Sequence, residues 1–280
     1  MPTELPDPLR SAPEHEAARR ALEKLRAKLH KDGTTVLPVV GAGLSIPPGA
    51  RLNVPSERDG LPETPTDRLP TWFEMLATLT RRMNASERAT YGVDEKLRRG
   101  EYLKAANILH DALSVGPIGI SSYIADTFLS PKFQRPRAYR ALVQLPVRQF
   151  LTTNYDPWLT LALGEKLHPG EARALTPRDS RAYLDLRFDS DPFVFHLHGR
   201  ADDPQHCVLT KDAYNRLFAD PKYFQQLTAF ANQRTLLFVG HSFNDPDLAL
   251  VLDNWQTLLG AGAPPRHYLL TARLDLADRN

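Results

Sequence analysis

Apolar residues recur along the first third of the chain with the spacing of helices, interrupted by one short apolar run. From Glu14 to Lys31 the three-to-four-residue spacing predicts an amphipathic helix, which the Asp32-Gly33 pair ends. The run from Thr34 to Val40 predicts a buried strand, with a local irregularity at Pro38, because proline cannot donate to a neighbouring strand. A proline-rich loop, Pro47 to Pro70, separates this strand from the next helical pattern.

Helical spacing resumes after that loop and continues to about Arg137. Thr71 is the predicted N-cap of the first of these helices, with Glu74 at the capping-box position. Beyond Arg137, apolar strands alternate with turns and helices in "VRQFLTTNYDPWLTLAL", "FVFHLHG", "TLLFVGHSFNDPDLALVL" and "RHYLLTA". The alternation predicts an α/β fold with a Rossmann-like, mainly parallel sheet and helices on both faces. We expect an N-terminal arm and helix over residues 1–33, a nucleotide-binding domain over 34–280, and a helical insertion at about 71–137.

Composition narrows the class of protein without identifying it. Hydrophobic residues make up 42% of the 280 positions and the formal net charge is +2, which indicates a globular chain without a strong nucleic-acid or membrane field. The single cysteine, Cys207, excludes an internal disulfide and a cysteine-rich zinc ribbon. We see no signal sequence and no membrane-spanning run, so we expect a cytoplasmic location and no membrane contact.

Four polar turns follow the predicted strands and therefore share the carboxyl edge of the sheet, where such folds bind ligands. They are Gly41 to Ser45, Thr152 to Asp156, His198 to Gly199, and Gly240 to Asn244. The first, "GAGLS", can hold a phosphate on its backbone or can serve tight packing. It is not a dinucleotide fingerprint, since Ile46 replaces the third glycine, and the chain has no P-loop motif.

Each of the other turns can also be interpreted either structurally or as part of a site. Asn154 and Asp156 can cap a helix that Pro157 begins, and Ser242 or Asn244 can cap another. His196 and His198 could bind a metal together with His206 and Cys207, but no further ligands follow at zinc spacing. We expect one histidine to pack and His198 to face the site, where an unperturbed pKa of about 6.5 suits a general base.

In this order, the motifs GAGLS, TTNYD, HLHG and GHS resemble those of the sirtuin superfamily, above all its bacterial sirtuin-like branch that cleaves NAD in anti-phage defence. The resemblance spans roughly Val36 to Thr271. It implies that NAD phosphates bind at Gly41, Ala42, Gly43 and Ser45, that Thr153, Asn154 and Asp156 form the nicotinamide-ribose pocket, that His198 is the catalytic base, and that Gly240 and Ser242 lie beside a phosphate or ribose.

The chain also departs from the protein-deacylating sirtuins. It lacks their four-cysteine zinc ribbon and their proline-aspartate-phenylalanine-arginine run, whereas "SIPPG" and "LPTWFEML" resemble the defence branch. The helical stretch up to about Arg137 would replace the ribbon, which leaves no evident docking groove for an acetyl-lysine peptide.

The resemblance therefore implies an NAD glycohydrolase that releases nicotinamide and ADP-ribose, with Asn154 and His198 as catalytic residues, NAD as substrate and no metal. The alternatives are a non-catalytic module that binds NAD or ADP-ribose and signals to a partner, a protein-lysine deacylase, and, last, a metal hydrolase using His196 and His198. The family context implies an effector that depletes NAD once triggered. It also implies a homo-oligomer, or a partner or fused sensor such as an Argonaute, a HerA-type ATPase or a nucleotide-sensing domain, with no direct nucleic-acid contact by this chain.

Overall fold

The structure is a computed structural model of the 280-residue chain. It describes residues 14–47, 50, 60–113, 119–168, 170–179, 191–241 and 267–270. Of the predicted site residues, Ser242 and Asn244 lie outside this set, as does most of the first half of the predicted Pro47 to Pro70 loop.

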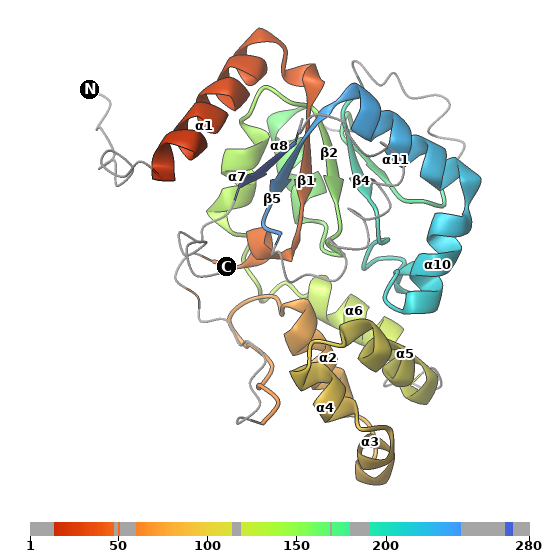
Figure 1. The fold of residues 1–280 in the computed structure, drawn as a ribbon. Coiled ribbons are helices and arrows are strands. Elements are labelled where there is room, and N and C mark those ends of the chain that lie inside the picture. The colour runs from red at the N-terminus through yellow and green to blue at the C-terminus, as the bar shows by residue number, and fades with distance from the viewer. Residues whose placement is uncertain are drawn as a thin grey trace.

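The described strands form one six-stranded sheet in the order β3-β4-β2-β1-β5-β6, and every pair of neighbours is parallel (Figure 1). The strands are β1 (Val36–Val40), β2 (Gln149–Thr152), β3 (Arg173–Leu175), β4 (Phe193–His196), β5 (Thr235–Val239) and β6 (Tyr268–Leu270). This arrangement confirms the predicted α/β fold with a parallel sheet. After β1 the chain builds the sheet outward through β2 and later returns to place β5 on the other side of β1, so the turns after β1 and β5 meet at a topological switch point.

The central strand β1 is fully buried and keeps its register with β5 over its whole length. Its pairs with β2 are Val39↔Leu151 and Val40↔Thr152, both of which follow Pro38. Because the carbonyl of Val40 accepts a hydrogen bond from Thr153 on the β2 side, strand alternation turns the nitrogen of Pro38 to that side too. The missing donor therefore lies before the β1–β2 pairing begins, and the strand continues unbroken.

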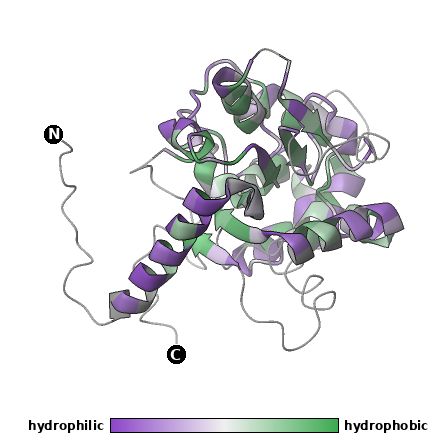
Figure 2. Ribbon diagram, turned by 90° about the horizontal axis from the view of Figure 1, so that it is seen from above, coloured by the Kyte–Doolittle hydropathy of each residue, from purple (hydrophilic) through white to green (hydrophobic). Residues whose placement is uncertain are grey.

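Alternate strand residues face two hydrophobic clusters, one on each side of the sheet. One cluster packs against α1 (Glu14–Lys31), α7 (Arg137–Val143) and α8 (Trp158–Lys166), and the other against α10 (Lys211–Ala219) and α11 (Pro221–Gln233). The two sets of helices flank the sheet in Figure 1. Seen from above, the strands are mainly hydrophobic, whereas α1 is mainly hydrophilic (Figure 2), as its exposure on one side of the molecule requires.

A third cluster belongs to a layer of helices at the carboxyl edge of the sheet, below the strands in Figure 1. The helices are α2 (Trp72–Thr80), α3 (Ala85–Tyr91), α4 (Val93–Arg98), α5 (Tyr102–Leu113) and α6 (Ile120–Phe128). The same cluster includes Tyr155, Ala201 and Leu209 from the loops after β2 and β4, so the layer shares its core with the turns of the site. The division of the chain into domains stays a prediction.

The start of α2 is held by the predicted capping box and by a buried ion pair. The Thr71 hydroxyl accepts from the Glu74 N–H at 3.3 Å, and the Glu74 carboxylate accepts from the Thr71 N–H at 2.8 Å. The same carboxylate receives two hydrogen bonds from Arg68, at 2.6 and 2.8 Å, and both side chains are buried. Since an unpaired buried charge is costly, this pair fixes the end of the loop before α2 to the helix.

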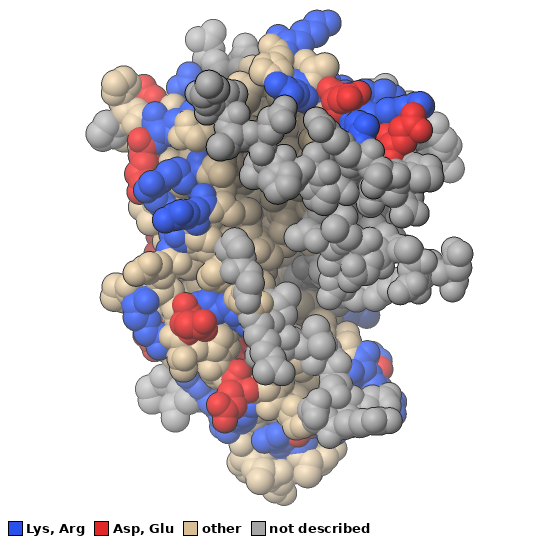
Figure 3. All heavy atoms as spheres, turned by 90° about the vertical axis from the view of Figure 1, so that its left-hand side faces the viewer, with Lys and Arg blue, Asp and Glu red and all other residues tan. Residues whose placement is uncertain are grey.

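Charged side chains on the face shown in Figure 3 include both signs around its rim. The ion pairs of the described residues include Arg135–Glu165, at 2.6 Å. Within the described residues, no helix combines the length and the apolar character needed to cross a bilayer.

Candidate active site at the carboxyl edge of the sheet

The turn after β1 is a short 3-10 helix, Ala42–Ser45, that packs directly on the turn after β5. The N–H of Gly41 donates to Val239 at 2.9 Å and the N–H of Gly43 donates to Gly240 at 2.8 Å. A Cβ on Gly43 would lie 2.6 Å from the Gly240 carbonyl oxygen, and one on Gly240 would lie 2.4 Å from the Leu44 nitrogen. The glycines are therefore required for close packing of two backbones, which is the second of the two readings left open by the sequence.

This packing decides which backbone donors of the turn remain for a ligand. The N–H groups of Gly41 and Gly43 are already engaged by β5 and its turn. By contrast, no described residue accepts from the N–H of Ala42. A phosphate at this turn would therefore be bound through Ala42 rather than through the two glycine N–H groups.

Three predicted side chains meet in one buried network that also contains Tyr139 from α7. Ser45 Oγ lies 3.0 Å from Asp156 Oδ2 and 2.7 Å from the Tyr139 hydroxyl, which in turn lies 3.1 Å from Asn154 Nδ2. An ionised carboxylate only accepts, so Ser45 donates to Asp156 and, at the shorter of its contacts, the Tyr139 hydroxyl donates to Ser45. The same hydroxyl lies 3.4 Å from both Asp156 oxygens, a longer alternative for its one hydrogen, and Asn154 Nδ2 donates to the Tyr139 oxygen. We call this directed chain the Asp156 relay. Sequence reasoning missed Tyr139, whose "RAYRALV" segment gives only a helical pattern.

The relay fixes the orientation of the Asn154 amide. Nδ2 also lies 3.2 Å from the Gly41 carbonyl oxygen, which can only accept, so this atom of the amide must be the nitrogen. With Nδ2 pointing into the protein, no described residue hydrogen-bonds the amide oxygen, Oδ1. Asn154 thus presents an oriented acceptor that none of the described residues uses.

Asp156 has an unusually high pKa for a carboxylate. Burial raises the pKa of Asp156 to about 6, against hydrogen bonds from the Trp158 N–H, Ser45 and Tyr139 that lower it. The Trp158 N–H, the first of α8, donates to Oδ1 at 3.1 Å, although the N-cap position of the helix is Pro157 rather than Asp156. These bonds place Asp156 behind Ser45, which in turn contacts Asn154.

Thr153 connects β2 to β1 at the point where the two strands end. Its N–H donates to the Val40 carbonyl at 3.0 Å, and its hydroxyl lies 3.5 Å from the same oxygen. These bonds hold the following residue, Asn154, beside the turn after β1.

The two histidines after β4 differ in what their ring nitrogens contact. β4 ends at His196, whose Nδ1 lies 3.1 Å from the Asn154 carbonyl oxygen and whose Nε2 lies 3.1 Å from Thr160 Oγ1. His196 is the packing histidine expected from the sequence. Nδ1 of His198 makes one long contact, 3.4 Å to the Tyr214 hydroxyl, and the ring also interacts with the backbone of Thr153.

The expectation of an unperturbed His198 is wrong. Burial, together with the charge that His241 can carry, lowers the pKa of His198 to about 3, against an opposing contact with the Thr153 backbone. The ring is 3% exposed, so the loss of hydration outweighs that contact. His198 is therefore neutral at pH 7 and able to accept a hydrogen bond.

The turn after β5 places a third histidine, His241, at the site, and no role was predicted for it from the sequence motifs. His241 follows Gly240, whose positive φ of 74° turns the chain back over the first turn. Its Nδ1 lies 2.7 Å from the position that a Cβ on Gly41 would occupy, so it is in contact with the turn after β1. The side chain is buried, and neither ring nitrogen has a hydrogen-bond partner among the described residues.

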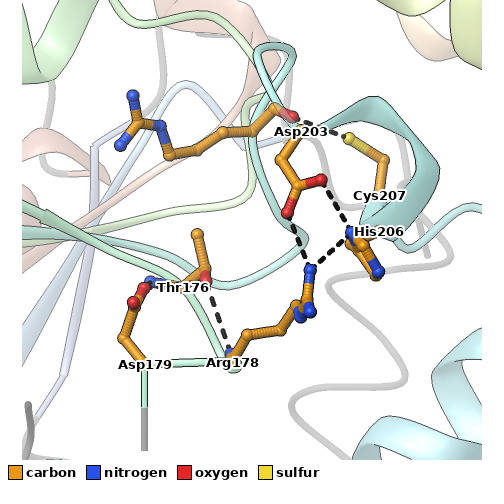
Figure 4. Close-up of polar contacts among 7 residues, drawn as sticks. Thr176, Arg178, Asp179, Asp203, His206 and Cys207 are labelled. Carbon is orange, nitrogen blue, oxygen red and sulfur yellow. Dashed lines mark hydrogen bonds and ion pairs between the residues drawn. The ribbon is translucent and has the colours of Figure 1, made fainter.

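The candidate metal ligands do not assemble around His196 and His198. His206 Nδ1 lies 2.7 Å from Asp203 and 2.7 Å from Arg178, and Cys207 Sγ donates to the Arg200 carbonyl, in a separate surface cluster (Figure 4). Burial raises the pKa of Cys207 to about 12, so its thiol stays protonated at neutral pH. Both nitrogens of His196 already contact protein oxygens, so the described histidines and cysteine do not fit a shared metal.

Comparison with known proteins decides the family of the second half of the chain. Residues 148–280 match the model of the SIR2-like domain. The matched stretch, just under half of the chain, is similar to SIR2-like domains. The resemblance to the sirtuin superfamily is thereby confirmed.

Curated relatives of the same kind are named "NAD(+) hydrolase ThsA". The chain is 30% identical over 153 residues to the one from Bacillus cereus strain MSX-D12, covering 54% of this chain and 31% of that protein. It is 29% identical over 162 residues to the one from Cytobacillus dafuensis, covering 58% and 32%, and 27% identical over 165 residues to the one from Enterococcus faecium, covering 57% and 33%. The matched region spans about a third of each relative's length.

The SIR2-like match includes Asn154, Asp156, His198 and His241, whereas the turn after β1 lies before it. Ser45 and Gly41 nevertheless bond to Asn154 in the folded chain. The site of the SIR2-like domain is thus completed by a turn that precedes the matched residues.

Proposed function

We propose that this protein hydrolyses NAD to nicotinamide and ADP-ribose. The observation that carries the proposal is Asn154, whose amide is held by Gly41, Ser45 and Tyr139 so that Oδ1 is an oriented acceptor that no described residue uses. The names of the relatives, NAD(+) hydrolase ThsA, support the same reaction. The proposal places NAD beside the residues implied by the sirtuin resemblance, which are Gly41, Ala42, Gly43, Ser45, Thr153, Asp156, Gly240 and Ser242. Among them, Gly41, Gly43 and Gly240 shape the backbone of the site, and Asp156 holds Ser45.

In the proposed reaction, the bond between the ribose anomeric carbon and the nicotinamide nitrogen breaks, and its electron pair leaves with nicotinamide. The ring is cationic before cleavage, so it departs as a neutral molecule and leaves an oxocarbenium-like ribose. A water oxygen then bonds to the anomeric carbon and loses a proton. Asn154 Oδ1 would accept a hydrogen bond from that water or from a ribose hydroxyl and hold it in place.

His198 is assigned as the acceptor for the proton of the attacking water. Its lowered pKa makes it a weak base, but an oxocarbenium-like centre is so electrophilic that water needs little activation before the bond forms. A neutral, buried imidazole suits this task because it does not place a second positive charge beside a cationic transition state. Asp156 acts behind Asn154 as a positioning residue, through Ser45 and Tyr139.

The alternative from another class is a non-catalytic module that binds NAD or ADP-ribose and signals to a partner. The relay argues for the enzyme, because a binding site does not need an amide held in one orientation with its acceptor unused. A protein-lysine deacylase ranks lower, since the helices α2–α6 occupy the chain where the zinc ribbon of deacylating sirtuins would stand.

The first test is nicotinamide release from NAD by the purified chain. Asn154→Ala removes the proposed acceptor, and we expect turnover to fall by about 10² or more. Tyr139→Phe removes only one hydroxyl of the relay, and we expect a fall of about tenfold in kcat with a small change in KM. His110→Ala on α5 changes an exposed histidine outside the site and is the matched control.

The outcomes separate the two readings. Equal nicotinamide release by wild type and Asn154→Ala would overturn the assignment of the site. Tight NAD binding without release in wild type, unchanged after addition of a trigger, would favour the signalling module.

The proposal includes a biological setting. We place the protein as the effector of an anti-phage defence system that depletes cytoplasmic NAD when a partner, a fused sensor or self-assembly activates it. The support is the sirtuin-like defence branch that its motifs resemble. Cellular NAD measured during phage infection, in cells carrying the chain or its Asn154→Ala variant, tests this setting.

A further inference from the structure

Asn154 is held by its backbone as well as by its side chain. Its N–H donates to Thr152 Oγ1 at 3.1 Å, and its carbonyl oxygen lies 3.1 Å from Nδ1 of His196. These two contacts, together with those of Nδ2, engage the polar atoms of the residue other than Oδ1. The proposed mechanism uses Oδ1 and gives no role to His196, the side chain that contacts the carbonyl.

The contacts of His196 determine which of its ring nitrogens carries the hydrogen. The carbonyl oxygen of Asn154 can only accept, so Nδ1 is the N–H donor. A neutral imidazole has one N–H, so Nε2, which lies 3.1 Å from Thr160 Oγ1, accepts from the threonine hydroxyl. Since Thr160 lies in α8 and His196 ends β4, the ring links both elements to the turn after β2.

Burial keeps the ring of His196 in this state. The side chain is 0% exposed, and the loss of hydration lowers its pKa to about 4. His196 is therefore neutral at pH 7, and Nε2 remains an acceptor for Thr160. A general base needs a ring nitrogen within reach of the proton that it removes, whereas both nitrogens of His196 contact protein oxygens. The ring is placed to support another residue rather than to transfer a proton.

We propose that His196 and Thr160 are a positioning pair, which holds the Asn154 carbonyl and through it keeps the Asn154 side chain in the orientation needed for NAD cleavage. This inference rests on the proposed function and adds two residues that act through Asn154. The carbonyl belongs to the peptide unit after Asn154, so a rotation of that unit changes the backbone angle ψ of the residue. A small misplacement of a group at a reaction centre is enough to slow the reaction markedly.

Two substitutions of His196 separate the donated hydrogen bond from the space that the ring fills. His196→Asn keeps a donor at the δ position, whereas His196→Leu has a similar branched shape and no donor. We expect kcat for nicotinamide release to fall about tenfold in His196→Leu, with KM changed by less than about twofold, and to recover most of this loss in His196→Asn. His110→Leu, at an exposed histidine of α5, is the matched control.

The threonine hydroxyl has its own matched pair of variants. Thr160→Val removes the donor to Nε2 and keeps the shape of the side chain, so Nδ1 loses the partner that keeps its hydrogen directed at Asn154. We expect kcat to fall about threefold in Thr160→Val and to stay at the wild-type value in Thr160→Ser, which keeps the hydroxyl.

A double-mutant cycle with Asn154→Ala distinguishes positioning from a general structural role. If His196 acts through the Asn154 side chain, its loss has an effect only while that side chain is present. We therefore expect His196→Leu to slow the residual turnover of Asn154→Ala by less than about twofold. An equal loss in both backgrounds overturns the inference, and so does a rise of KM in step with the fall of kcat.

The nitrogen NMR shifts of the His196 ring test the geometry without turnover. We expect a protonated Nδ1 and an unprotonated Nε2 in the wild type, and the opposite tautomer overturns the inference whatever the activity. If wild type releases nicotinamide and His196→Leu releases it equally fast, this inference alone has failed. If wild type neither binds NAD nor releases nicotinamide, the proposed function itself has failed.

Discussion

Among the buried titratable residues of the site, Asp156 is the one whose pKa lies nearest to neutral pH. Burial raises the pKa of Asp156 to about 6, whereas His196, His198 and His241 have lowered pKa values and stay neutral above pH 5. Protonated Asp156 can donate as well as accept, so the direction of the relay to Asn154 is no longer fixed.

The raised pKa of Asp156 predicts that nicotinamide release becomes slower on the acid side of its pH profile. We expect kcat/KM to be constant from about pH 7 upward and to fall about tenfold per unit below pH 6, as Asp156 gains its proton. Asp156→Asn should be slower throughout and lack this fall, because its side chain does not titrate. A fall of unchanged midpoint in Asp156→Asn would show that another group controls the profile.

At this scale the sequence identified most residues of the network but not how they bond. Ser45, Asn154 and Asp156 follow β1 and β2, so their presence at one edge follows from strand order. Tyr139 lies in a helix that carries no motif. His241 lies within the GHS motif, in which the family resemblance gives roles only to Gly240 and Ser242. Only the packing of α7 and of the two turns shows that these residues reach the same place.

At the scale of elements, the site depends on the close contact of the turns after β1 and β5. Gly240 has a positive φ, and its Cβ position is 2.4 Å from a backbone nitrogen, so a side chain there meets backbone that cannot rotate away. Gly164, in α8, has nothing within 4 Å of its Cβ position.

These two glycines give opposite predictions for the same substitution. Gly240→Ala should lower the free energy of unfolding by more than about 2 kcal/mol, from left-handed strain and the clash, and should weaken ADP-ribose binding. Gly164→Ala should raise it by about 0.5–1 kcal/mol, since alanine loses less conformational entropy in a helix. Denaturant unfolding of both variants checks this, and a harmless Gly240→Ala would contradict the packing described for the two turns.

For the whole molecule, the buried histidines link stability to pH. Each has a pKa of about 6.5 when unfolded and of about 3 to 4 when folded, so the unfolded chain binds more protons below pH 6.5. Their contribution to stability is therefore present above pH 6.5 and is lost as pH falls. Asp156 acts in the opposite direction, because its raised pKa costs stability as pH rises from about 4 to about 6.

We therefore expect the free energy of unfolding to decrease on acidification from pH 6.5 to 5. Each histidine contributes a slope of up to about 1.4 kcal/mol per pH unit, and Asp156 offsets part of one. His241→Phe should remove about a third of the histidine contribution, whereas His110→Ala should leave the slope unchanged. Urea unfolding at a series of pH values measures these slopes, and equal slopes in wild type and His241→Phe would show that His241 is not a buried neutral histidine.

The sequence by itself determined the order of elements and the edge at which chemistry lies. Local periodicity and capping residues specify the helix Glu14–Lys31, the buried strands and the capping box at Thr71, and parallel strands bring their following turns to one edge. These features depend on neighbours within a few residues, so a pattern along the chain records them.

Only the tertiary structure decided which atoms of the site are used and which are left over. Four features of the site arise from groups distant in sequence. They are the glycine N–H groups engaged by β5 and its turn, the Asn154 amide held by Tyr139, the lowered pKa of His198, and the buried ring of His241, whose nitrogens have no hydrogen-bond partner among the described residues. Burial and hydrogen-bond partners are properties of the packed chain. They set the protonation state of each group and the donors and acceptors that remain for a ligand, neither of which follows from residue type alone.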